Sequence, residues 1–90
     1  MMWYCLKVES EKARFPKTLE ALGFEYYEAD NGFTFESEYF CDIEEKADCL
    51  IEMNIDFQFI IAYDYGDYST RNVHDKDIYL LYKEDYNEEV

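Results

Sequence analysis

The sequence has few of the residues from which catalytic and phosphate-binding motifs are built. Its 90 residues include one histidine, one proline and three glycines, and its three cysteines show no CxxC spacing. Neither a glycine-rich phosphate loop nor a GxSxG nucleophile motif is present. The single histidine, His74, lies in the polar segment NVHDKD, where a lone histidine is usually a solvated side chain. We therefore expect a protein that is not an enzyme.

Basic residues are also scarce, which restricts the class of partner. Eight Lys and Arg stand against 22 Asp and Glu, and the formal net charge is −14. Residues 18–70 contain fourteen of the acids and a single base, Lys46. Nucleic acids and anionic membranes bind clustered Lys and Arg, so we do not expect direct binding to either. The charge favours a cationic partner, whether a protein, a polyamine or a metal ion.

Long apolar runs and disulfide spacings are missing as well. No run approaches the roughly 20 apolar residues of a membrane-spanning helix, and the segment MMWYCLKVE lacks the layout of a signal peptide. Three cysteines cannot all pair within one chain, so we expect Cys5, Cys41 and Cys49 to be reduced thiols in the core. These features favour the cytoplasm of a bacterium or of an infected host cell.

Aromatic residues, by contrast, are abundant. Seven Phe and ten Tyr contribute to a hydrophobic content of 49%, which is enough to build a core despite the charge. Ninety residues suit one compact domain. We expect residues 1–90 to form that domain, with a frayed acidic tail at residues 85–90.

Strand and helix signals alternate along the chain. Strands are predicted at residues 2–8, 24–30, 33–39, 55–64 and 77–83, and the first of them is expected to be buried on both faces. The first helix ends at Gly23 and begins either after Ser10 as its N-cap or at Pro16 in its first turn. The order predicts a ferredoxin-like (split βαβ) α+β fold, β-α-β-β-α-β plus one extra C-terminal strand, with two helices on one face of an antiparallel sheet. Another α+β arrangement of the same elements is the alternative.

The pair Asn31-Gly32 predicts a two-residue hairpin turn, because this pair is strongly preferred in such turns. In the resulting register one side of the hairpin faces the core and carries Phe24, Tyr26, Phe33, Phe35 and Tyr39. The other side is acidic and carries Glu25, Glu36 and Glu38 around Tyr27. Glu25 lies directly opposite Glu38 in this register, a like-charge pair that destabilises a hairpin.

Asp42 and Glu45 form a capping-box pattern that predicts the start of a second helix. The buried stripe of this helix has helical spacing and consists of Ile43, Ala47, Leu50 and Ile51. Its opposite side carries Glu44, Glu45, Asp48 and Glu52, which we expect to extend the acidic surface of the sheet.

The segment YDYGDY, residues 63–68, alternates acids with tyrosines. Tyrosine is enriched at the energetic centres of protein interfaces because it offers a large rigid ring with a polar end. Asp64, Tyr65, Asp67 and Tyr68 therefore join the candidate partner-binding residues.

Acids in the following loop also raise the question of a metal site. Asp64, Asp67, His74, Asp75 and Asp77 offer ligands that suit Ca²⁺ or Mg²⁺. Their spacing does not match a DxDxDG loop that ends in Glu, and acids in a loop are commonly only solvated. We expect neither a metal nor a cofactor.

In size, charge and tyrosine content the chain is similar to the small acidic inhibitors that phages use against host nucleases, such as anti-CRISPR and anti-restriction proteins. The resemblance implies a protein that occupies the basic nucleic-acid-binding surface of a bacterial defence nuclease or CRISPR effector, by nucleic-acid mimicry. The expected partner-binding residues are Glu25, Tyr27, Glu36, Glu38, Glu44, Glu45, Asp48, Glu52, Asp64, Tyr65, Asp67 and Tyr68. The alternatives are an immunity protein or antitoxin that neutralises a cognate basic toxin, and a non-catalytic interaction domain or homodimer.

Overall fold

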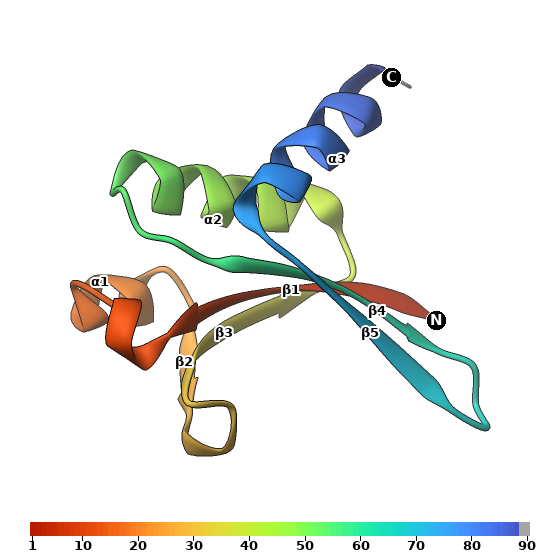
Figure 1. Ribbon diagram of the computed structural model, residues 1–90, viewed down its shortest axis with the longest axis horizontal. Helices are drawn as coiled ribbons and strands as arrows, with labels where there is room; N and C mark the ends of the chain where they lie inside the picture. Colours follow the sequence, from red (N-terminus) through yellow and green to blue (C-terminus); the bar gives the residue numbers. More distant parts are fainter. Residues whose placement is uncertain (89–90) are drawn as a thin grey trace.

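A five-stranded antiparallel sheet organises the computed structural model, which describes residues 1–88 (Figure 1). Its strands lie in the order β2-β3-β1-β4-β5. They span Met2–Glu9 (β1), Glu25–Tyr27 (β2), Gly32–Ser37 (β3), Gln58–Asp64 (β4) and Ser69–His74 (β5). The helices are α1 (Pro16–Ala21), α2 (Phe40–Glu52) and α3 (Lys76–Glu88), with 3₁₀ turns η1 (Ser10–Lys12) and η2 (Glu28–Asp30).

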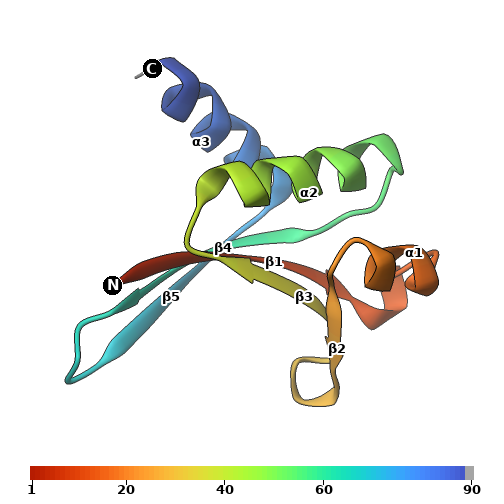
Figure 2. The same ribbon diagram turned by 180° about the vertical axis from the view of Figure 1, so that it is seen from behind.

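Two helices cover one face of the sheet and leave the other face open. α2 packs over β1 and β3, while α3 packs over β4 and β5. The short helix α1 lies beside the C-terminal end of β1, as both ribbon views show (Figures 1 and 2). We call the face that looks away from α2 and α3 the open face.

The core lies between the sheet and these two helices. Alternate residues of β1, namely Tyr4, Leu6 and Val8, point toward the helices because side chains alternate along a strand. Phe59 of β4 lies at the centre, stacked on Tyr4 with ring centroids 6.0 Å apart and edge-on to Tyr79 at 5.5 Å. Burying each such large side chain contributes about 1.5–3 kcal/mol. The core is therefore built from aromatic rings, as the composition indicated.

The predicted α+β class is confirmed, whereas the ferredoxin-like topology is not. The fifth strand is residues 69–74, and the segment 77–83, predicted to be a strand, lies in helix α3. Asp75 caps this helix, since its carboxylate accepts the backbone N–H of Ile78 at 3.0 Å. Spacings of three and four residues then bring Tyr79, Tyr82 and Tyr86 onto Phe40 of α2. Part of the predicted frayed tail thus lies within α3, and residues 89 and 90 lie outside the described residues.

The predicted two-residue turn at Asn31-Gly32 is wrong. Residues 28–30 form η2, and Asn31 ends that turn in the left-handed conformation with φ of 52°. Gly32 begins β3, where a Cβ atom would overlap the carbonyl oxygen of Val8. The glycine is needed for close approach to β1 rather than for the turn. Glu25 consequently pairs with Thr34, and the predicted opposition of Glu25 and Glu38 does not occur.

The register of this hairpin nevertheless differs from the predicted one by four residues, an even number. Each side chain therefore keeps its predicted face, because faces alternate with period two. Phe24 and Phe33 are buried as expected, but Tyr26 and Tyr39 are 51% and 65% exposed. β2 has only three residues, and Phe40 occupies the core at the start of α2.

The helix starts also decide between the sequence alternatives. α1 begins at Pro16, so the first-turn alternative is correct, and the Ser10 alternative is a separate 3₁₀ turn. Helix α1 is terminated at Gly23, as predicted, and the φ of this glycine is +100°. The N–H of Phe24 donates a hydrogen bond to the carbonyl of Leu19.

The capping box predicted for α2 is absent. The helix starts two residues earlier than expected, at Phe40. The Asp42 carboxylate instead accepts the Ser37 hydroxyl at 2.7 Å. Within residues 1–88, no helix is long and apolar enough to cross a membrane.

Candidate functional site

The open face is made of the strand residues that alternate with the core residues. Cross-strand pairs place Cys5 between Glu36 of β3 and Ile60 of β4, and Trp3 beside Ala62. β2 and β5 continue the face at its two edges with Glu25, Tyr27, Arg71 and Val73. The working surface predicted around Glu25, Tyr27, Glu36 and Glu38 therefore belongs to this face.

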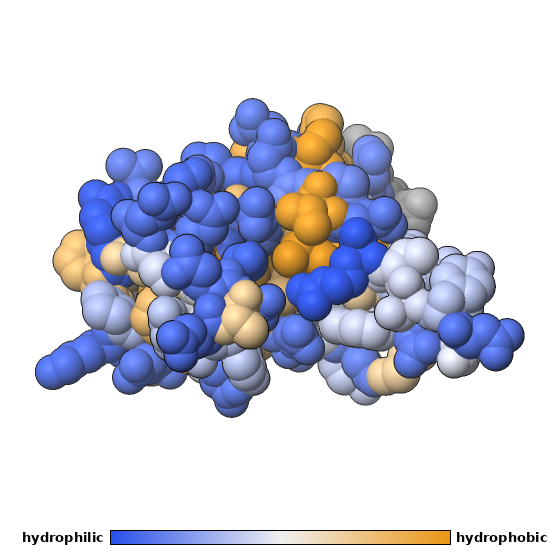
Figure 3. Space-filling model, turned by 60° about the horizontal axis from the view of Figure 1, so that its bottom comes forward, coloured by the Kyte–Doolittle hydropathy of each residue, from blue (hydrophilic) through white to orange (hydrophobic). Residues whose placement is uncertain are grey.

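An apolar floor runs through the middle of the open face. Cys5, Ile60 and Ala62 are each at most 2% exposed although no helix covers them. Larger cross-strand neighbours flank the two small side chains, with Glu36 and Ile60 beside Cys5 and with Trp3 and Arg71 beside Ala62. Figure 3 shows a side of the molecule on which an apolar patch near the centre is surrounded by hydrophilic side chains. A polar rim around an apolar centre is the usual anatomy of a protein-binding patch.

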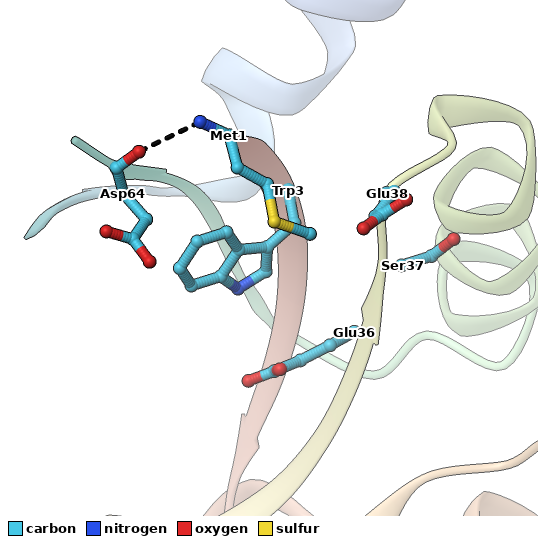
Figure 4. Close-up of a pocket in the computed structure, with 6 residues that line it drawn as sticks. All are labelled: Met1, Trp3, Glu36, Ser37, Glu38 and Asp64. Atoms are coloured by element: carbon cyan, nitrogen blue, oxygen red, sulfur yellow. Dashed lines mark hydrogen bonds between the residues drawn. The ribbon is translucent and has the colours of Figure 1, made fainter. Parts of the chain in front are cut away.

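A pocket of about 410 Å³ opens on this face next to the only tryptophan of the sequence. We call it the Trp3 pocket; its lining is Met1, Trp3, Glu36, Ser37, Glu38 and Asp64. Glu36 extends from β3 toward the indole, and Asp64 lies on the other side of the ring, as Figure 4 shows. Asp64 is held there because its backbone exchanges two hydrogen bonds with Met1, at 2.7 and 2.8 Å.

The carboxylates of the Trp3 pocket are electrostatically unbalanced. Among the described residues, Glu36, Glu38 and Asp64 form no salt bridge. Lys7 and Arg71 are bases of the same face, and neither lines the pocket. Burial, followed by the nearby charge of Glu36, raises the pKa of the Cys5 thiol from 9.0 to about 12. The face thus carries negative charge that its own bases leave unpaired.

Tyrosines flank the open face at both ends. The Tyr27 hydroxyl donates a hydrogen bond to the carboxylate of Glu25, which raises the pKa of the Tyr27 phenol. At the β4–β5 turn, Tyr65 and Tyr68 stack with ring centroids 4.8 Å apart and are 55% and 62% exposed. β2 with its turn and the β4–β5 hairpin both bend away from the helices at opposite ends of the sheet (Figure 1).

The acids of α2 lie apart from this surface, in the helical layer. Asp48 accepts hydrogen bonds from Lys83 at 3.0 Å and from the Tyr79 hydroxyl at 3.3 Å, so it connects α2 to α3. Glu45 pairs with Lys46 at 3.9 Å, and Glu44 accepts the side-chain amide of Asn87 at 3.4 Å. Glu52 is exposed at the last turn of α2. The structure does not bring these four residues together with the acids of the sheet.

The residues considered as metal ligands are spread along β5. Asp64 and Asp67 lie at the hairpin tip, whereas His74 and Asp75 lie at the other end of the strand. At ~3.3 Å per residue, six strand residues separate the two groups by roughly 20 Å. No group of three His, Cys, Asp or Glu side chains in residues 1–88 could hold a metal ion.

Sequence reasoning missed Trp3, which lines the pocket on this face. The segment 2–8 was expected to be buried on both faces, whereas Trp3 is half-buried and faces the pocket. The isolated tryptophan, alternating with the core residues of β1, was the available signal.

The chain matches no protein-family model, no curated protein sequence and no solved structure.

Proposed function

We propose that the protein is a small acidic inhibitor that binds the basic nucleic-acid-binding surface of another protein. Its target class would be a bacterial defence nuclease or CRISPR effector in the cytoplasm, and its source a phage or mobile element. The observation that supports this proposal best is that Glu36, Glu38 and Asp64 form no salt bridge with any described residue, whereas Asp48 and Glu45 of α2 are engaged within the chain. Free carboxylates on a face without a covering layer suit a basic partner.

The spacing of these acids is comparable with that of phosphates. Side chains on one face of a strand repeat every ~6.8 Å, and neighbouring strands lie ~4.8 Å apart. Glu36 and Glu38 are two residues apart, with Glu25 in the next strand. Phosphates recur every ~3.4 Å along one duplex strand, so the two charge densities agree within a factor of about two. The carboxylates therefore resemble phosphates in the sign of their charge and approximately in charge density, so they suit a groove that binds a nucleic-acid backbone.

A capture experiment with a competition step tests the proposal. The protein is immobilised, host lysate is applied, bound proteins are eluted with a salt gradient, and each is purified. We expect at least one to be a nucleic-acid-binding protein that loses its nucleic acid when the inhibitor is added. Glu36→Lys/Glu38→Lys should weaken this competition at least about tenfold, because removing rim charges slows association and unpaired charges oppose binding.

The matched control is Glu20→Lys/Glu84→Lys, which changes the net charge equally at exposed positions of α1 and α3. It should change the competition by less than about twofold, since distant exposed charges are screened. Binding that persists unchanged in half-molar salt and is indifferent to reversal of Glu36 and Glu38 contradicts the proposal. Capture of a lethal toxin without nucleic-acid-binding activity would instead identify an immunity protein or antitoxin.

A further inference from the structure

We propose that the Trp3 pocket receives an arginine side chain of the basic partner, with the guanidinium stacked on the indole and paired with the surrounding carboxylates. This inference rests on the proposed function and names the chemistry that the partner must present. It makes Trp3 the anchor of the interface, with Glu36, Glu38 and Asp64 as its electrostatic complement.

The charges of the pocket select a cation. Three carboxylates line it, and no Lys or Arg of the described residues does. Arg71 lies on the same face, but it forms no salt bridge with any of the three. An anionic ligand would meet net repulsion there, because the Met1 ammonium, bonded to the Asp64 carbonyl, is one positive charge against three carboxylates. A second copy of the chain, itself carrying a net charge of −14, would add to that repulsion.

The indole selects the type of cation. Arginine is the cation found most often over aromatic faces, and tryptophan is the aromatic ring that binds cations best. Its planar guanidinium also presents a fork of N–H donors that matches carboxylates, whereas the lysine ammonium is a compact, strongly hydrated charge. A small metal ion, in contrast, requires converging oxygens, and no group of three His, Cys, Asp or Glu side chains among residues 1–88 could hold one.

The size and floor of the pocket suit a side chain better than a free ion. Its volume of about 410 Å³ falls in the range of small-molecule sites, which is ~300–1,000 Å³. The apolar side chains of Met1 and Trp3 give the pocket its floor. The methylene groups of arginine pack on such a surface while the charged head remains near the carboxylates. An aromatic anchor at the centre of a polar rim is also where binding energy concentrates.

A peptide titration tests this directly, because Trp3 supplies the only indole N–H of the chain. The protein, labelled with ¹⁵N, is titrated with acetylated hexa-arginine amide, with the hexa-lysine peptide, and with the neutral, isosteric hexa-citrulline peptide. We expect the indole resonance to shift with the arginine peptide, the lysine peptide to bind at least about fivefold more weakly, and the citrulline peptide to leave the resonance unchanged.

Two pairs of variants separate the pocket from general charge. Glu36→Gln/Glu38→Gln should weaken arginine-peptide binding about tenfold, measured by calorimetry, and Glu20→Gln/Glu84→Gln, with the same net charge, by less than about twofold. Trp3→Leu keeps apolar bulk and should abolish the preference for arginine over lysine. Circular dichroism verifies that Trp3→Leu is folded, and Trp3→Phe, which retains a weaker aromatic face, should recover part of that preference.

The proposal is overturned if the arginine peptide binds without moving the indole resonance, or if both double variants weaken binding equally. It is also overturned if the resonance moves on dilution of the protein alone, since the occupant is then a second copy. These outcomes differ from failure of the proposed function. If Trp3→Leu displaces nucleic acid from a captured target as well as the wild type does, the proposed inhibitor function stands and the arginine site is wrong. If the arginine peptide binds at Trp3 but no nucleic-acid-binding target is captured, the arginine site stands and the inhibitor function is wrong.

Discussion

Cys5 illustrates how one residue can lie on an open face and still be inaccessible. It is completely buried, and its pKa of about 12 leaves the thiol protonated and unreactive at neutral pH. Cys41 is exposed and Cys49 is half-buried, so the expectation of buried thiols is correct for Cys5 only. Thiol reagents should accordingly label Cys41 first and Cys5 last.

The raised pKa of Cys5 predicts a loss of stability in alkali. As the pH rises above 9.0, the thiol ionises in the unfolded chain and stays protonated in the folded one. The stabilisation is therefore complete below pH 9 and is lost between about pH 9 and 12. The slope is about 1 kcal/mol of unfolding free energy per pH unit.

Denaturant titrations between pH 9 and 10, before Tyr4 and Tyr79 ionise, measure this slope. Cys5→Ala and Cys5→Val should both show a shallower dependence than the wild type by that amount. Alanine and valine differ in side-chain volume and therefore in packing. If both variants have the same slope, the change in slope is due to loss of the ionisable thiol and not to packing. A wild-type slope in either variant contradicts the assignment.

At the scale of elements, the N-cap of α3 is the most local test of the fold. The Asp75 carboxylate accepts the N–H of Ile78, and this contact distinguishes the helix from the strand that the apolar run 77–83 suggests. Asp75→Ala should lower the free energy of unfolding by about 1 kcal/mol. Asp75→Asn keeps the acceptor and should remain within a few tenths of the wild type. Equal losses in both variants would show that the cap contributes nothing.

The elements that sequence reasoning predicted well have a clear apolar period. In the stripe predicted for α2, Ile43, Ala47 and Leu50 are buried and Ile51 is half-buried. In the segment 55–64, predicted as a strand, Phe57 and Phe59 are buried. α3 was misassigned because a short run of Ile, Tyr and Leu fits both strand and helix. β5 was missed because its sequence STRNVH has no apolar alternation. It forms because β4 offers a free edge, a nonlocal cause that no sequence window contains.

The candidate site was predictable in part for the same reason. Glu25, Glu36 and Tyr27 share the open face because face assignment depends only on the parity of the register. The joining of these residues to Asp64 and Trp3 depends on the order β3-β1-β4, which local pattern does not reveal. The helical spacing correctly places the acids of α2 on the surface of that helix. It does not reveal that α3 packs beside it and that Lys83 forms a salt bridge with Asp48.

At the scale of the whole molecule, the charge of −14 opposes stability through repulsion among the acids. Glu36 and Glu38 repel each other and Asp64 without compensating bases, and added salt screens such repulsion. Glu36→Gln/Glu38→Gln should therefore raise Tm by about 4 °C at low ionic strength, equivalent to ~1 kcal/mol. Half-molar sodium chloride should shrink the difference. Calorimetric scans in both buffers measure it, and a double variant less stable than the wild type would contradict this origin of the strain.

The two outer strands of the sheet carry a consequence for how the protein behaves at high concentration. β2 is only three residues long, and β5 presents polar residues and Arg71 along its length. Short or charged outer strands are poor templates for strand addition by other chains. Copies are thereby discouraged from polymerising edge to edge. The protein should therefore remain dispersed as it accumulates, and these two strands favour that dispersion without using any residue of the open face's apolar floor.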